Sequence, residues 1–246
     1  MKQLEKTLII QHSIATPPGS TLQFLNDRAL PYQVMMASDL ANEIVRDGTG
    51  AATNWGNLLG FENLILCGGG MNVDQEDQYP WLRQEKLLIA QFVKTNKRIL
   101  GLCLGGQLIA EVLGAKVQKH DAWEVGWKLV AIDSTASPLL KFSPSQLEVF
   151  QFHAYRFFLP EGARRFAENS ICQDQGFVFG NSTVAFQFHP ESTRQWIYEC
   201  TLDDPQDGPY PAGEFAQPAS LVAEQLGKQP ALQDWYFKFL QSWIQS

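Results

Sequence analysis

Short, largely apolar runs alternate with stretches of helical spacing along most of the chain. The runs predict strands at residues 7–12, 32–36, 63–67, 99–102, 128–132, 148–152 and 183–188. Between them, helices are predicted at 20–29 with Ser20 as N-cap, at 80–94, and at 107–113, which Gly114 and Lys116 terminate. This alternation is typical of an α/β fold: an open, doubly wound, mostly parallel sheet with helices on both faces.

The chain is predicted to form one domain, 1–246, with its core at 7–200. Residues 38–60 are polar and dotted with glycine, and predict a helix and a loop. Residues 201–218 are rich in turn formers and predict a loop rather than a hinge. A helical extension is expected at 219–246. One face of its helix carries a large apolar stripe that predicts packing against the domain: Leu232, Trp235, Tyr236, Phe239, Leu240 and Trp243.

Composition, charge and cysteine spacing argue against several classes of function. The 246 residues include 19 Lys and Arg against 26 Asp and Glu, a net charge of −7, which argues against a nucleic-acid surface. No apolar stretch approaches membrane-spanning length, and the start predicts a strand rather than a signal peptide. The cysteines are widely spaced, unlike a disulfide framework or a zinc site: Cys67, Cys103, Cys172 and Cys200. We therefore expect a cytoplasmic protein without a cofactor, a metal, a nucleic acid or a membrane partner.

Cys103 lies on the turn from the predicted strand at 99–102 into the helix that follows. Gly101-Leu-Cys103-Leu-Gly105 has the spacing of a nucleophile elbow, with sulfur in place of the serine oxygen. The dipole at a helix N-terminus favours a thiolate, and the N–H of Leu104 points toward the same spot, where it can hold an oxyanion. A buried structural cysteine beside a tight turn is the alternative interpretation.

Three consecutive glycines, Gly68 to Gly70, follow the predicted strand at 63–67. A glycine run at the carboxyl end of a parallel strand lets backbone N–H groups approach a ligand, at the edge where α/β folds place their sites. A plain turn needs fewer glycines, so the pattern favours a binding loop. The sequence lacks the G-x-x-x-x-G-K-[ST] pattern of an ATP loop.

The strand predicted at 183–188 runs into His189-Pro190-Glu191. Because the carboxyl ends of parallel strands share one edge of a sheet, His189 can meet Cys103 there. Glu191 is placed to orient the imidazole and to stabilise the imidazolium. An isolated histidine would more often be a loop residue, but together with the elbow and the glycine run it predicts a Cys–His–Glu triad.

These motifs together resemble the class I glutamine amidotransferases, in particular the small stand-alone proteins related to the amidotransferase domain of GMP synthase. The likeness covers roughly residues 7–200. It rests on Gly68 to Gly70, on Gly101 to Gln107, on Glu124-Val-Gly-Trp127 and on Phe188 to Ser192. The resemblance implies a flavodoxin-like fold and hydrolysis of the glutamine side-chain amide.

The resemblance also implies a role for each matched residue. Cys103 attacks the γ-carboxamide, His189 carries protons, and Glu191 orients His189. The N–H groups of Gly69 and Leu104 hold the oxyanion, and water then cleaves the γ-glutamyl thioester. The resemblance further implies substrate contacts at Gly70, Gln107, His153, Ala154 and Tyr155.

Two segments depart from the family's pattern. Gly69-Gly70-Met71 stands where these proteins commonly carry Gly-Gly-Pro-Met, so the loop lacks a rigid proline. His153-Ala154-Tyr155 stands where they commonly carry His-Gly-Asp, which predicts a weaker hold on the substrate backbone. His153 is interpreted as a structural or substrate-edge residue rather than a member of the triad.

Three functions remain open on the sequence. The first is a glutaminase that passes ammonia to a separate synthetase or other acceptor protein, since the chain carries no ATP-binding motif. The second is a stand-alone γ-glutamyl hydrolase or peptidase that uses the same thioester and releases another amine. The third is a regulatory binding module with an inactive site, against which the complete triad argues.

Overall fold

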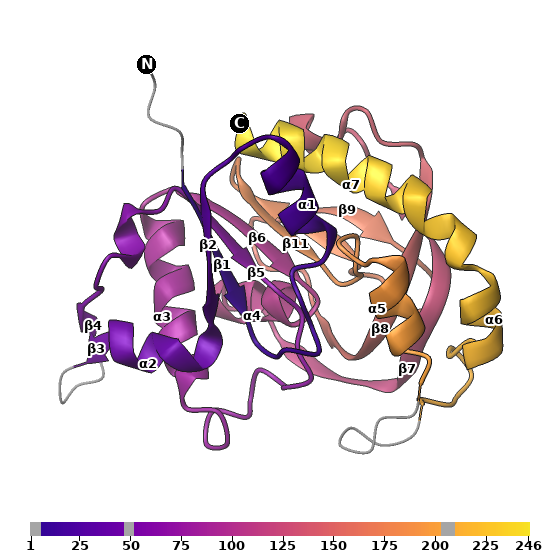
Figure 1. The fold of residues 1–246 in the computed structure, drawn as a ribbon, viewed down its shortest axis with the longest axis horizontal. Coiled ribbons are helices and arrows are strands. Elements are labelled where there is room, and N and C mark those ends of the chain that lie inside the picture. Colours follow the sequence, from indigo (N-terminus) through magenta and orange to yellow (C-terminus); the bar gives the residue numbers. More distant parts are fainter. Residues whose placement is uncertain (1–5, 47–51, 203–209) are drawn as a thin grey trace.

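A nine-stranded sheet runs through the computed structural model, which describes residues 6–46, 52–202 and 210–246. The strand order is β2-β1-β5-β6-β11-β10-β9-β7-β8 (Figure 1). Five neighbouring strands are parallel: β2 (Tyr32–Met36), β1 (Thr7–Gln11), β5 (Asn63–Leu66), β6 (Arg98–Leu102) and β11 (Thr183–Phe186). The other four pair antiparallel: β10 (Gly176–Phe179), β9 (Arg164–Glu168), β7 (Val117–Ile132) and β8 (Gln146–Phe157).

Helices cover both faces of this sheet, which confirms the predicted α/β fold. One apolar layer is formed with α1 (Ser20–Asp27), α5 (Arg194–Glu199) and α7 (Gln229–Ile244), and the other with α2 (Leu40–Glu43), α3 (Trp81–Lys94) and α4 (Leu104–Val112). Successive side chains of β1 pack alternately into the two layers: Ile9 belongs to the first layer, and Leu8 and Ile10 belong to the second. A strand buried on both faces therefore appears in the sequence as an unbroken apolar run.

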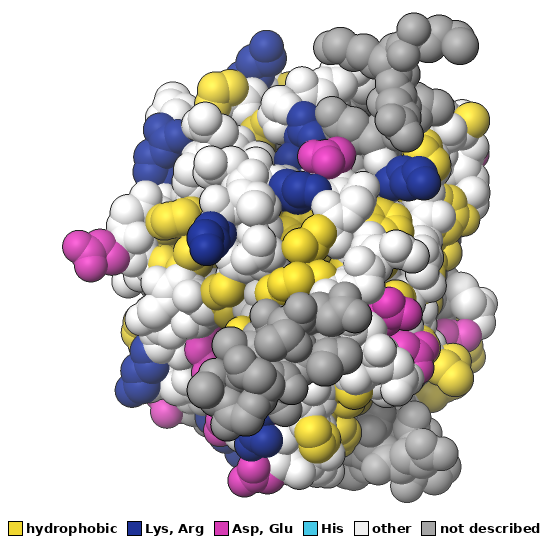
Figure 2. Space-filling model, turned by 90° about the vertical axis from the view of Figure 1, so that its left-hand side faces the viewer, with side chains coloured by type: hydrophobic (Ala, Val, Ile, Leu, Met, Phe, Trp, Pro, Cys, Tyr) yellow, Lys and Arg dark blue, Asp and Glu magenta, His cyan; other side chains and the backbone are white. Residues whose placement is uncertain are grey.

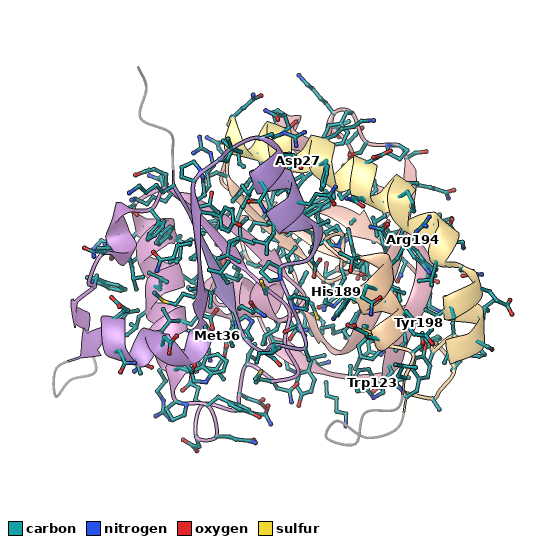
Figure 3. All side chains as sticks on the ribbon, in the orientation of Figure 1. Asp27, Met36, Trp123, His189, Arg194 and Tyr198 are labelled. Carbon is teal, nitrogen blue, oxygen red and sulfur yellow. The ribbon has the colours of Figure 1, made fainter. Side chains whose placement is uncertain are left out.

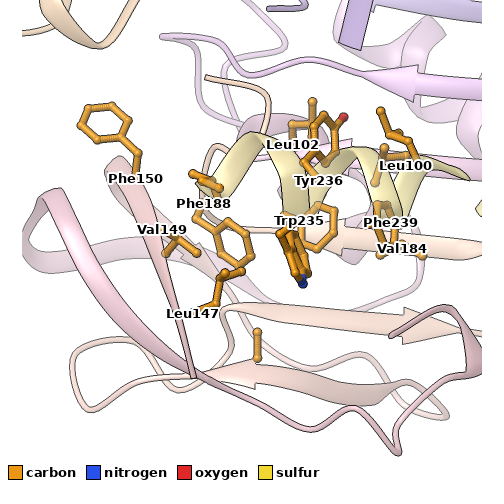
Figure 4. Packing of buried hydrophobic residues seen from close by; sticks show 14 of the residues in the cluster. Leu100, Leu102, Leu147, Val149, Phe150, Val184, Phe188, Trp235, Tyr236 and Phe239 are labelled. Carbon is orange, nitrogen blue, oxygen red and sulfur yellow. The ribbon is translucent and has the colours of Figure 1, made fainter. Parts of the chain in front are cut away.

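The C-terminal helix α7 packs on the strands that lead into the site. All six residues of its predicted apolar stripe are buried, which confirms that prediction. Trp235 and Phe239 stack with each other and both meet Phe186 of β11, with ring centroids 5.8 and 5.0 Å from it. Figure 4 shows Trp235 and Phe239 of α7 with Leu100 and Leu102 of β6 in one cluster. The helix thus braces the two strands that carry Cys103 and His189 at their ends.

The antiparallel half of the sheet differs most from the prediction. Strands β7 and β8 are longer than the predicted strands at 128–132 and 148–152, and His153 lies within β8 rather than at its end. The two strands form a long hairpin at the sheet edge. Polar residues interrupt the apolar pattern of both strands, and Glu124, Gln151 and His153 are polar although they are buried, so the pattern did not reveal where the strands end. Strands β9 and β10 were not predicted at all.

Smaller differences concern helix ends and connections. Ser20 is the first residue of α1 and not its N-cap, which is Gly19 at a φ of +55°. The segment predicted as a helix and a loop contains α2 between 3₁₀ turns, η1 (Ala37–Asp39) and η2 (Leu58–Gly60), and the short strands β3 (Val45–Arg46) and β4 (Ala52–Asn54).

Of the predicted loop at 201–218, residues 203–209 lie outside the described ranges and 210–218 form no helix. The extension contains α6 (Ala219–Glu224) and a third 3₁₀ turn, η4 (Leu226–Lys228), before α7; a fourth such turn, η3 (Pro138–Leu140), lies between β7 and β8.

The surface carries charge of both signs. Figure 2 shows Lys and Arg side chains scattered singly among apolar and uncharged groups on one face of the molecule. In the described part of the chain, no helix combines the length and the apolar character needed to cross a membrane.

Candidate active site

Cys103 occupies the turn between β6 and α4. Its φ of +50° and ψ of −104° are an uncommon backbone conformation for a residue with a side chain, and such strain concentrates at functional sites. The turn is held in place because the N–H of Cys103 donates to the carbonyl of Phe186 at 2.9 Å. Its side chain is 6% exposed.

The glycines around Cys103 are required by close packing. A Cβ on Gly101 would lie 2.5 Å from the backbone of Gly105, and one on Gly105 would lie 2.4 Å from the carbonyl oxygen of Leu66 in β5. A Cβ on Gly106 would lie 2.7 Å from the carbonyl oxygen of Phe186 in β11. Helix α4 can therefore start directly against three neighbouring strands only because these positions lack side chains.

His189 follows the end of β11 and lies beside α5, near the centre of Figure 3. Its Nδ1 lies 2.8 Å from Oε1 of Glu191, and a Cβ on Gly68 would lie close to both the His189 ring and Cβ of Cys103, so the imidazole and the cysteine flank the same point of the loop. Because Nδ1 faces Glu191, the other ring nitrogen is the one available to the sulfur. The backbone N–H of His189 donates to Phe150 O at 2.9 Å, and the indole of Trp196 packs on the ring with centroids 4.8 Å apart. The imidazole is thus fixed from three sides.

The charge state of His189 follows from these neighbours. Burial alone would lower the pKa of the imidazole, but the Glu191 carboxylate and the Cys103 sulfur raise that pKa to about 10. The arrangement therefore favours an imidazolium that is paired with a carboxylate and lies beside the cysteine. Such a pair is poised to give a proton to a leaving group.

The glycine loop reaches the same place. A Cβ on Gly68 would lie 2.8 Å from Cε1 of His189 and 3.7 Å from Cβ of Cys103, and one on Gly69 would lie 2.8 Å from Cδ2 of Leu104. Leu104 is the first residue of α4, so its N–H has no acceptor within the helix. The structure therefore brings the Gly68–Gly70 loop beside Cys103 and His189 and against the first residue of α4.

Among the other residues of the predicted site, Gln107 on α4 contacts the segment that contains Tyr155. Its Nε2 donates to the carbonyl of Tyr155 at 3.0 Å and contacts Oε1 of Gln187 at 3.4 Å. Ala154 and Tyr155 are half-buried on β8. A Cβ on Gly70 would meet nothing within 4 Å, so open space adjoins that residue.

His153 is enclosed by protein. Its Nδ1 lies 3.0 Å from the carbonyl of Tyr155 and its Nε2 lies 3.2 Å from Oε2 of Glu124, with both side chains almost fully buried. Burial alone would raise the pKa of Glu124, but His153 and donors from Asn169 and Gln175 lower it overall. The ring is therefore bonded to the protein through Nδ1, whereas Nε2 faces the Glu124 carboxylate at ion-pair distance without a hydrogen bond.

Two neighbours of the triad were not predicted from the sequence. Gln187 is fully buried and its Nε2 lies 3.8 Å from Sγ of Cys103. Trp196 on α5 covers the ring of His189. Gln187 stands two residues before His189 and within the strand predicted at 183–188, and the period of two of that predicted strand could have placed both on one side of the chain. Across the described ranges, no group of three or more His, Cys, Asp or Glu residues is arranged to hold a metal ion.

Comparison with known proteins gives a consistent result. The family model described as "Glutamine amidotransferase class-I" matches residues 27–196. The glutamine amidotransferase-like protein YfeJ of Salmonella typhimurium is 33% identical over 189 residues, which cover 75% of this chain and 74% of that protein. One of the subunits of the glutamine-hydrolysing GMP synthase of Thermoplasma acidophilum is 33% identical over 138 residues, which cover 54% of this chain and 65% of that relative.

A more distant relative and a solved structure extend the comparison. Gamma-glutamyl peptidase 4 of Arabidopsis thaliana is 24% identical over 175 residues, 68% of each chain. A crystal structure of a glutamine amidotransferase from Thermotoga maritima matches with a TM-score of 0.81 and 25% identity, over 99% of this chain and 100% of that one. The similarity thus extends over nearly the whole chain, including α7.

Proposed function

The chain belongs to the class I glutamine amidotransferase family, and on this basis we propose that it hydrolyses the side-chain amide of glutamine to glutamate and ammonia. The observation that carries the proposal is the buried group of Cys103, His189 and Glu191, in which Glu191 holds His189 at 2.8 Å and both His189 and Cys103 lie against Gly68. The sulfur in this group stands at the N-terminus of a helix and against a glycine loop. A nucleophile, a proton carrier and a group that orients that carrier are the parts that acyl transfer requires.

The reaction proceeds in two halves. The Cys103 sulfur attacks the γ-carbonyl carbon, and the thiol proton resides on His189, whose positive charge Glu191 stabilises. The negative charge that develops on the carbonyl oxygen is held by the N–H groups of Gly69 and Leu104. His189 then gives its proton to the departing nitrogen, the C–N bond breaks, and ammonia leaves a γ-glutamyl thioester on Cys103.

The second half uses the same groups in the opposite direction. His189 takes a proton from water as the oxygen attacks the thioester carbon, and the C–S bond breaks to release glutamate and restore the sulfur. Gln187 supports both halves, because its amide N–H points at the sulfur and stabilises negative charge there.

A separate protein would receive the ammonia. The relative from Thermoplasma acidophilum is by its name part of a GMP synthase with more than one kind of chain, and we propose that this chain likewise serves an acceptor protein. A second candidate is a γ-glutamyl peptidase, which the Arabidopsis relative and the open space beside Gly70 favour. In that case the same thioester forms and a larger amine departs in place of ammonia.

Incubation with glutamine and a panel of γ-glutamyl amides and peptides, with glutamate release followed by mass spectrometry, tests the proposal. We expect release from glutamine that disappears in Cys103→Ala and persists in Cys172→Ala, a matched loss of a buried thiol elsewhere. Preference for a larger γ-glutamyl compound would select the peptidase. Release that survives in Cys103→Ala, or no release from any compound, would overturn both.

A further inference from the structure

A second buried His–Glu pair, His12 with Glu85, lies behind the glycine loop. We propose that His12, held by Glu85 and helped by Thr16, is a positioning residue that fixes the Gly68–Gly69 peptide so that the N–H of Gly69 faces the reacting carbonyl. The inference rests on the proposed hydrolysis and explains how the loop acquires the orientation that this reaction needs.

Two side chains bind one carbonyl oxygen of the loop. Nδ1 of His12 lies 3.1 Å from the oxygen of Gly68, and Oγ1 of Thr16 donates to the same oxygen at 2.9 Å. Since a carbonyl can only accept, the Nδ1 of His12 must carry a proton. Both donors come from the segment between β1 and α1, so they approach the loop from one side.

The geometry of a peptide unit converts this anchor into an orientation of the next N–H. In a trans peptide the C=O and the N–H point in opposite directions. The carbonyl of Gly68 points at His12 and Thr16, so the N–H of Gly69 points away from them. Gly68 itself lies against Cys103 and His189, which places the site on that other side.

The loop needs such an anchor because its own backbone restricts it so little. Gly68, Gly69 and Gly70 are consecutive, and a peptide between two glycines can rotate without a steric penalty from side chains. Without the two donors, the Gly68–Gly69 peptide could turn its carbonyl oxygen toward the oxyanion and repel it.

Glu85 fixes the imidazole that provides this donor. Its Oε1 lies 2.8 Å from Nε2 of His12, both side chains are fully buried, and the indole of Trp81 stacks on the His12 ring at 5.6 Å. Burial alone would lower the pKa of His12, but Glu85 and the backbone carbonyls beside it raise that pKa overall. A buried ion pair is a poor means of adding stability, since an apolar pair of similar size often does as well. A positioning role accounts for its presence at this place.

Replacing His12 with asparagine or with glutamine distinguishes the role of its bond to Gly68 from that of its bond to Glu85. An asparagine amide nitrogen can occupy the place of Nδ1 and keep the bond to Gly68, whereas a glutamine amide reaches the place of Nε2 and loses that bond. Thr16→Val removes the second donor with little change in shape. His120→Gln is the matched control, because His120 is also buried with both ring nitrogens against backbone carbonyls, those of Ala122 and Ile171 on the antiparallel half.

The decisive measurement compares turnover with alkylation of Cys103. Loss of one oxyanion donor lowers kcat about 10²- to 10³-fold in a protease. We expect the His12→Gln, Thr16→Val double variant to lose at least about tenfold in kcat for glutamine, at a KM within about threefold of wild type. Its rate of alkylation by iodoacetamide should equal that of wild type, because this displacement at carbon forms no oxyanion. His12→Asn should retain more kcat than His12→Gln, and His120→Gln should retain all of it.

Three outcomes overturn the inference: an unchanged kcat in the double variant, an alkylation rate that falls in parallel with kcat, or an equal loss in His12→Asn and His12→Gln. If the wild type hydrolyses no γ-glutamyl compound, the proposed function fails instead. In that case a crystal structure of the His12→Gln, Thr16→Val double variant tests the orientation of the loop independently of activity. A rotated Gly68–Gly69 peptide supports the positioning role, and an unrotated one refutes it.

Discussion

A single methyl group at Gly68 should disable the site without disturbing the triad residues chemically. The φ of Gly68 lies outside the left-handed region, so the backbone of Gly68→Ala is unstrained and the added Cβ alone acts. That carbon would lie 2.8 Å from Cε1 of His189, against about 3.5 to 4.0 Å for an ordinary carbon–carbon contact. The loop and the imidazole must therefore separate by about 0.7 to 1.2 Å.

The imidazole has little room to yield. Trp196 packs on it, Glu191 holds its Nδ1, and its own N–H is bonded to Phe150. If the ring moves, it leaves Cys103; if the loop moves, Gly69 leaves the oxyanion. A misplacement of 1 Å can cost about 10²-fold in rate, and overpacking a core typically costs about 1 to 3 kcal/mol of stability. We expect Gly68→Ala to lower kcat about 10²-fold while the protein remains folded.

Steady-state hydrolysis of glutamine and urea denaturation measure the two quantities. Gly227→Ala is the control for the chemical change, because a Cβ there meets nothing within 4 Å. Gly70→Ala should be as stable as wild type for the same reason, so a raised KM in that variant would come from a substrate contact at Gly70. A Gly68→Ala protein with wild-type kcat would refute the contact between the loop and His189 on which the reasoning depends.

The other predictions concern the groups around the sulfur. His189→Asn should lower kcat by several orders of magnitude and Glu191→Gln by less, since only the first carries protons; equal, mild losses would show that His189 is not the base. Gln187→Leu should lower kcat about tenfold and slow alkylation of Cys103, because the sulfur anion loses an N–H donor worth about 1.5 kcal/mol; unchanged alkylation would contradict this. Since the pKa of His189 is raised from 6.5 to about 10 in the folded protein, its contribution to stability is complete below pH 6.5 and is lost as the pH rises toward 10. The free energy of unfolding should therefore fall over this range in urea titrations, less steeply in His189→Asn, and an equal slope in both proteins would count against the assignment.

Strands β1, β5, β6 and β11 could be predicted from the sequence because they are buried on both faces and appear as apolar runs. Strands β5 and β6 were predicted within one residue at each end, and β2 was predicted at its observed residues although it lies at the sheet edge and has no buried position. The hairpin of β7 and β8 could not be predicted in full, because polar residues, several of them buried, interrupt its apolar pattern. An apolar run marks a strand well, whereas a strand that carries many polar side chains is predicted too short.

The same limit applies to the candidate site. The turn at Cys103 and the glycine run carry local signatures, so the sequence alone drew attention to them. His12 shows no such signature, since it is one histidine after an apolar run and its partner Glu85 lies 73 residues away on another element. The contact exists because α3 packs across the end of β1, which is a property of the assembled layers. Groups that support a site through tertiary packing are invisible to motif reading for this reason.

The strand order has a consequence for the stage of folding at which the Cys103 sulfur becomes reactive. Cys103 and Gln187 are 84 residues apart in sequence, yet β6 and β11 are neighbours in the sheet, and the antiparallel strands fill the interval between them. Contacts of such separation form late, because closing a long loop costs entropy before any pairing repays it. A partly folded chain therefore carries an ordinary thiol with no base, and activation of the sulfur coincides with the docking of β11. The rate at which Cys103 becomes reactive during refolding should accordingly report on completion of the sheet, and a nascent chain is spared an activated thiol until its last strand is in place.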